Sequence, residues 1–127
     1  MIAEDYVGFE TRNLLWQKGM PKDCFNHLVC ENTQENTVRK YYTCSLYKAM
    51  KWLREIYNFH ICVSVGTDES SDADGKIVEE WSFWTFLIES TYGNIIYDAC
   101  AQFDPIEYQS YEEACEAAIK YVLENLI

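Results

Sequence analysis

The sequence predicts an α+β fold, and three observations support this prediction. Residues 46–57 and 111–126 repeat apolar side chains three and four positions apart, which is the spacing of a helix buried on one face. Between these two segments the apolar residues recur at every second position, as they do in strands. Short connections rich in turn-forming residues separate the strands and favour an antiparallel sheet. The expected order is helix, short hairpin, helix, three-stranded antiparallel meander, and a C-terminal helix packed on the sheet.

The first helix is expected from Phe9 to Lys18. Gly19 can adopt the left-handed backbone that ends a helix, and Pro21 prevents its continuation. The segments "KDCFNHLVCEN" and "VRKYYTC" then flank the polar stretch "TQENT". This pattern predicts a hairpin with its turn at residues 33–37.

The second helix is expected from Ser45, as N-cap, to Asn58, as a left-handed C-cap. Its basic and acidic residues fall on the face opposite the apolar stripe, with Trp52 among them. The stripe consists of Leu46, Ala49, Met50, Leu53, Ile56 and Tyr57.

The three predicted strands are "FHICVSV", "KIVEEWSFWTFLIES" and "NIIYDACAQF". We interpret the intervening "GTDESSDADG" and "TYGN" as loops, because both are rich in turn-forming residues. The middle strand is apolar on both faces, with Trp81 on one face and Trp84 on the other. It is therefore either covered on both sides or displays aromatic side chains to a partner.

The final helix is expected to begin at Ser110, whose side chain caps it, and Glu113 would complete a capping box. Glu116 and Lys120 are expected to pair on its solvent face. The predicted buried stripe consists of Tyr111, Ala114, Cys115, Ala118, Ile119, Val122 and Leu126.

A length of 127 residues predicts a single domain, with a helix plus hairpin at 1–44 and an αβββα core at 45–127. The chain begins without a basic, apolar leader, and its apolar runs are too short to span a membrane. We therefore expect a cytoplasmic protein with no membrane partner, in which the six cysteines are free, buried thiols. No motif implies a cofactor.

The charge is divided unevenly along the chain. The net charge is −11, yet residues 36–54 contain Arg39, Lys40, Lys48, Lys51 and Arg54 and no acid. Residues 55–127 contain fifteen acids and two bases. These two regions of opposite sign predict an electrostatic docking surface.

Three segments also carry a resemblance: "YVGFETRNLLWQKGM", "SLYKAMKWLREIYNFHI" and "SYEEACEAAIKYVLENLI". They resemble a large group of small uncharacterised proteins of gut Bacteroidales and of their phages and mobile elements. The resemblance implies a bacterial or phage origin and a cytoplasmic location, but no activity, cofactor or site residues. The strand–strand–strand–helix ending is also similar to that of HicB-like antitoxins, without their DNA-binding tail or their other motifs.

Neither a metal site nor an active site is predicted. Cys24, His27 and Cys30 form one C-x₂-H-x₂-C cluster, with Cys44 downstream but without the second ligand pair that zinc usually requires. In a strand, His27 would also face away from the two cysteines. His60 and Cys62 would share a strand face, and ordinary packing explains that pair better than catalysis does.

The preferred hypothesis is a non-catalytic interaction module that binds a basic protein or a second copy of itself. The candidate binding residues are Arg39, Lys40, Lys48, Lys51, Trp52 and Arg54. One alternative is a HicB-like antitoxin. The other is a nucleic-acid-binding αβββα module that uses the basic segment 39–54, since the element order matches that of double-stranded-RNA-binding domains. Acids in the first strand connection and at the start of the final helix would repel phosphates and disfavour this alternative.

Overall fold

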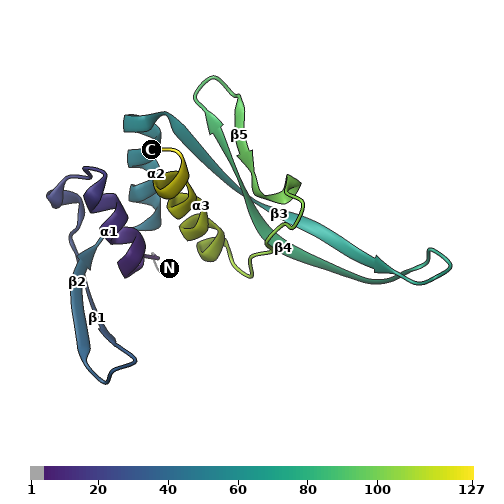
Figure 1. Cartoon of the computed structure of the whole chain (residues 1–127), viewed down its shortest axis with the longest axis horizontal. Coiled ribbons are helices and arrows are strands. Elements are labelled where there is room, and N and C mark those ends of the chain that lie inside the picture. The colour runs from purple at the N-terminus through teal and green to yellow at the C-terminus, as the bar shows by residue number, and fades with distance from the viewer. Residues whose placement is uncertain (1–4) are drawn as a thin grey trace, which may run out of the picture.

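The structure, a computed structural model, describes residues 5–127 and has the predicted α+β fold (Figure 1). A two-stranded and a three-stranded antiparallel sheet accompany the helices, in the orders β1-β2 and β3-β4-β5. The helices are α1 (Phe9–Gln17), α2 (Leu46–Tyr57) and α3 (Tyr111–Asn125). The strands are β1 (His27–Asn32), β2 (Val38–Thr43), β3 (Phe59–Ser71), β4 (Ile77–Ser90) and β5 (Ile95–Asp98), and two 3-10 turns are η1 (Lys22–Cys24) and η2 (Ala99–Ala101).

The predicted helix ends are confirmed in atomic detail. The Ser45 hydroxyl accepts a hydrogen bond from the Lys48 amide at 3.1 Å, and Asn58 has the left-handed backbone that ends α2. The Ser110 hydroxyl likewise accepts from the Glu113 amide at 3.1 Å. The predicted capping box differs in one contact: the Glu113 carboxylate accepts from the amide of Gln109, one residue before the cap, rather than from that of Ser110. The two serine hydroxyls satisfy backbone donors that a helix start otherwise leaves unpaired.

The core forms where α3 packs against the other two helices and against one face of the larger sheet. Ile61 of β3 lies directly opposite Ile88 of β4, and both belong to one buried cluster with Leu53 of α2 and Ile119 of α3. Burying side chains of this size stabilises a fold by about 1.5–3 kcal/mol each. This cluster therefore joins α2, α3 and the base of the sheet.

Three predictions about helix faces are corrected. Tyr111 was assigned to the buried stripe of α3, but it lies in the first turn of that helix and is 42% exposed. Ile56 was assigned to the buried stripe of α2, but it lies at the edge of that stripe and is 59% exposed. Glu116 was expected to pair with Lys120; instead its carboxylate accepts a hydrogen bond from the Gly8 amide at 2.8 Å. Lys120 pairs with Glu10 at 3.2 Å and with Glu124 at 3.8 Å. Packing of the N-terminal segment against α3 brings Gly8 to Glu116, and spacing within one helix does not reveal that contact.

The predicted acidic loop at residues 66–75 is largely strand. β3 continues through Ser71 and pairs with β4 as far as Ile77, so the turn itself comprises only residues 72–76. Within the turn, the Asp72 carboxylate accepts from the amides of Asp74 and Lys76, both at 2.9 Å. Cross-strand pairing overrides the low strand propensity of glycine and aspartate in this segment.

The third strand is shorter than predicted. β5 ends at Asp98, whose carboxylate accepts from the Cys100 amide at 3.0 Å and starts the η2 turn. The chain leaves the sheet and returns at Tyr108, whose backbone exchanges two hydrogen bonds with Trp84. β4 therefore has partners on both edges only near its base.

Beyond that base, β3 and β4 form a two-stranded ribbon that we call the acidic arm, residues 65–82. Figure 1 shows the arm extending away from the three helices, with its tip at the far end of the molecule. Every residue from Ser71 to Ser82 is exposed. The arm carries six acids, Asp68, Glu69, Asp72, Asp74, Glu79 and Glu80, and one base, Lys76.

Candidate functional site

The predicted basic segment does not form one surface. Arg39 lies on β2, where its guanidinium pairs with the Glu31 carboxylate of β1 and sits 4.0 Å from the centre of the Phe9 ring. The contact with Phe9 packs the hairpin against α1, and the ion pair joins the two strands of the hairpin. Lys40, the next residue of the strand, is exposed on the opposite face of the hairpin.

Three of the predicted cations do lie together on α2. Lys48, Lys51 and Arg54 follow one another at three-residue spacing, so they share the solvent side of the helix. Lys51 is also 4.0 Å from Glu55, at the limit of an ion pair. Tyr47 is 64% exposed on this side and provides the aromatic group that the sequence analysis attributed to Trp52.

Trp52 instead packs against the buried core. Its ring is half-buried and meets the ring of Tyr57 edge-on, with 5.4 Å between ring centres. The surface of α2 that could bind a partner therefore consists of Tyr47, Lys48, Lys51 and Arg54, which we call the α2 basic face.

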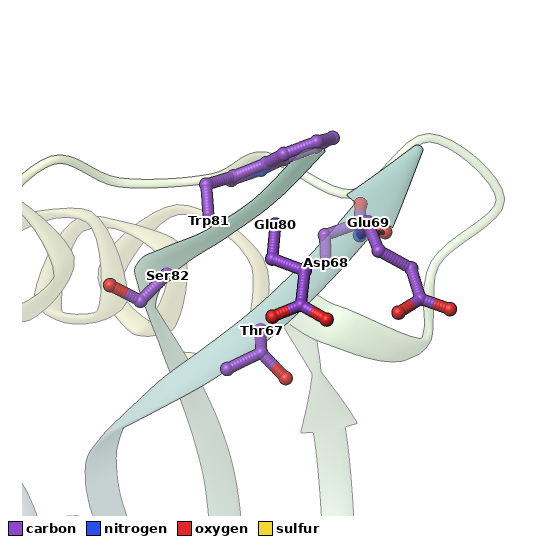
Figure 2. Close-up of a pocket in the computed structure, with 6 residues that line it drawn as sticks. All are labelled: Thr67, Asp68, Glu69, Glu80, Trp81 and Ser82. Carbon is purple, nitrogen blue, oxygen red and sulfur yellow. Dashed lines mark hydrogen bonds between the residues drawn. The ribbon is translucent and has the colours of Figure 1, made fainter. Parts of the chain in front are cut away.

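The acidic arm gathers more charge than the α2 basic face. Glu69 and Glu80 are directly opposite each other on neighbouring strands, and both are exposed. Like charges in such a pair repel each other and destabilise the strand pairing. Figure 2 shows the Glu80 carboxylate and Thr67 on one side of the ribbon and the Trp81 ring on the other. An open hollow of about 540 Å³ is lined by Thr67, Asp68, Glu69, Glu80, Trp81 and Ser82.

Apolar side chains accompany the acids on the arm. Trp81 is 37% exposed, and its indole N–H donates to the Glu107 carboxylate at 2.8 Å, which fixes the position of the ring. Val65 and Val78 are more than half exposed. Val78 is the extra residue at an irregularity of the β3–β4 pairing, where a bulge twists the end of the ribbon. The arm thus presents fixed apolar groups among carboxylates.

The thiols lack the electrostatic surroundings of a nucleophile. Burial raises the pKa of Cys44 to about 12 and the pKa of Cys115 to about 11. Burial, together with the neighbouring Glu89 carboxylate, also raises the pKa of Cys62. Catalytic cysteines require the opposite, a pKa lowered by nearby positive charge. Of the six free cysteines, Cys30 and Cys100 are exposed, so the prediction that all are buried is wrong for those two.

His27 and Cys30 of the first hairpin are held apart. His27 stacks on Tyr6 with 3.6 Å between ring centres, while Cys30 is exposed on the other face of β1. Within residues 5–127, one set of three potential metal ligands does converge: His60, Cys62 and Glu89. The first two were expected to share a strand face, but Glu89 was not predicted beside them, because its position depends on the register of the β3–β4 pairing.

Comparisons with protein-family models, with curated proteins and with solved structures found no match to this chain. Among the described residues, no helix has both the length and the apolar character required to cross a bilayer.

Proposed function

We propose that this chain is a small, non-catalytic protein-interaction module that binds a basic partner protein through the acidic arm. One observation carries the proposal: the arm extends from the core and places six acids and one base among exposed apolar side chains. Much of its surface belongs to neither the core nor the helices.

The charges of the arm favour a cationic partner. Bringing Glu69 and Glu80 together across the ribbon costs repulsion, and a lysine or arginine side chain placed between them would remove that cost. Complementary charge also accelerates encounter and fixes the orientation of the two proteins. Trp81 and Val78 supply apolar area, and aromatic anchors contribute much of the energy of protein interfaces.

The thiols and the resemblance support a cytoplasmic location for the interaction. Six free cysteines, two of them exposed, are expected in a reducing compartment, so we place the interaction in the cytoplasm. The resemblance of the helices to small proteins of gut Bacteroidales and their phages supports a role as an accessory factor of a phage or mobile element.

The proposal is tested by neutralising charge on the arm and, as a control, elsewhere. The arm variant carries Glu69→Gln, Glu79→Gln and Glu80→Gln. The control carries Asp23→Asn, Glu35→Gln and Asp104→Asn, which removes the same net charge from exposed sites outside the arm. Each protein is immobilised, incubated with lysate of its native host, and the retained proteins are quantified by mass spectrometry.

We expect the wild-type chain and the control to retain the same basic protein, and the arm variant to lose most of it. Retention by the wild type should also fall as salt rises from about 0.05 M to about 0.5 M, because the Debye length shortens several-fold. Equal retention of the basic protein by both variants, or retention that does not change with salt concentration, would overturn the proposed role of the arm.

The α2 basic face supports a second candidate function, nucleic-acid binding. Three cations and an exposed tyrosine on one helix face combine phosphate-contacting and stacking groups. In this case Lys48→Glu with Lys51→Glu should abolish a low-salt mobility shift with RNA or DNA. The control, Lys22→Glu with Lys76→Glu, should retain it. The absence of any shift with the wild-type chain would remove this candidate.

A further inference from the structure

A second cluster lies at the base of the sheet, away from the tip of the arm. His60 and Cys62 are two residues apart on β3, so both side chains project from the same face. Glu89 of β4 lies directly opposite His60. One ligand atom from each of the three residues lies within 4.8 Å of the other two, and the Cys62 Sγ is 3.5 Å from the Glu89 Oε1.

The backbone around this cluster is well defined. His60, Cys62 and Glu89 all lie within the continuous β3–β4 pairing, and β5 supports β4 on its other edge. The β4–β5 pairing is irregular between Ile88 and Glu89, because β5 has one extra residue there. Such bulges commonly reorient a side chain next to a functional site. The sheet therefore holds the three groups together without a flexible loop.

The three groups are suited to one class of metal. Imidazole nitrogen, thiolate sulfur and carboxylate oxygen are the ligand types that zinc takes, whereas calcium and magnesium prefer oxygen alone. With zinc bond lengths of about 2.0–2.3 Å, ligand atoms around a tetrahedral ion are roughly 3.3–3.8 Å apart. Small side-chain rotations would bring these three atoms from within 4.8 Å to that spacing.

We propose that His60, Cys62 and Glu89 bind a zinc-class divalent transition metal, with water at the fourth position. His60 is exposed, whereas Cys62 and Glu89 are half-buried, so the fourth position would face solvent. On binding, the Cys62 thiol gives its proton to solvent, and its sulfur lone pair replaces one of the metal's waters. The site does not involve the acidic arm, so it stands whether or not the arm binds a protein.

The test uses the untagged, full-length chain, freed of metal and kept reduced, and titrates it with Co²⁺ as a spectroscopic substitute for Zn²⁺. We expect one ion per chain, with the absorption of a thiolate-bound, four-coordinate cobalt ion, and displacement of that ion by Zn²⁺. Calorimetric titration with Zn²⁺ measures the affinity independently.

The variants identify the ligands. Cys62→Ser should remove the thiolate absorption, and His60→Gln and Glu89→Gln should each weaken Zn²⁺ binding by at least about tenfold, since even outer-shell changes cost that much. Cys30→Ser and Cys100→Ser remove the two exposed thiols and should change neither result. Circular dichroism checks that each variant is folded. Absence of thiolate-bound cobalt in the wild type, or its persistence in Cys62→Ser, would overturn the proposal.

Discussion

Arg39 shows how the environment of one residue changes its role. The sequence analysis placed it in a binding surface because of its charge and its neighbours. Its guanidinium instead pairs with Glu31 and lies over the Phe9 ring, 4.0 Å from the ring centre. The ion pair joins the two strands of the hairpin, where Glu31 lies directly opposite Arg39, and the cation–π contact packs the hairpin on α1. The contact with Phe9 could not be inferred from sequence, because it depends on how the hairpin packs against the helix.

The buried and exposed thiols should differ in how fast they react with an alkylating reagent. Cys44 and Cys115 are fully buried, and their raised pKa values keep them protonated at pH 8, whereas Cys30 and Cys100 are exposed. We expect iodoacetamide at pH 8 to label the exposed pair quickly and the buried pair only after unfolding in urea. Peptide mass spectrometry measures both rates. Equal labelling of Cys44 and Cys30 in the folded protein would contradict the burial.

The raised pKa of Cys44 predicts that the free energy of unfolding falls at alkaline pH. A thiol in the unfolded chain ionises near pH 9, while Cys44 in the folded protein stays protonated until about pH 12. The unfolded state therefore loses the proton first as pH rises. The stabilisation is fully present below pH 9, and the free energy of unfolding should fall between about pH 9 and pH 12.

At the scale of the element, the arm depends on a close contact between its two strands. Gly66 lies opposite Phe83, and a Cβ atom at position 66 would be 2.7 Å from the phenyl ring, which is buried. Gly66→Ala therefore forces the ring to move. We expect a loss of about 1–3 kcal/mol in the free energy of unfolding, as for other overpacked sites.

Urea denaturation measures this loss, and Thr67→Ala is the matched control. Thr67 is exposed on the neighbouring position, so its replacement should change the free energy of unfolding by less than about 0.5 kcal/mol. Equal stability of Gly66→Ala and the control would show that the ring has room to move.

The ends of the helices were predicted more accurately from the sequence than the ends of the strands. The ends of α2 and α3 were predicted to within a residue, because Ser45, Asn58 and Ser110 act through local backbone hydrogen bonds. The predicted lengths of β3 and β5 were wrong. β3 keeps pairing with β4 through Ser71 despite the turn-forming residues in its sequence, and β5 ends at Asp98, where the chain turns into η2 although β4 continues. Glu89 was missed as a neighbour of Cys62 because the register of the β3–β4 pairing cannot be read from the sequence.

At the scale of the whole molecule, only one of the two charged segments of the sequence forms a single charged surface in the fold. The acids of residues 68–80 remain together on one projecting ribbon, because hairpin strands keep sequence neighbours close. The basic segment is divided between a hairpin, where Arg39 pairs with Glu31, and the helix α2. The acidic arm is therefore the more strongly charged surface of the folded molecule. We propose that this surface contacts a basic protein.

Site-specific photo-cross-linking in cells of the native host tests this claim most directly. A photoreactive residue replaces Val78, on the arm, or Tyr92, which is even more exposed in the β4–β5 turn. We expect position 78 to form an adduct with one basic protein and position 92 to form none. Equal adducts from both positions, or none from position 78 under conditions where the photoreactive chain is folded and abundant, would contradict the claim.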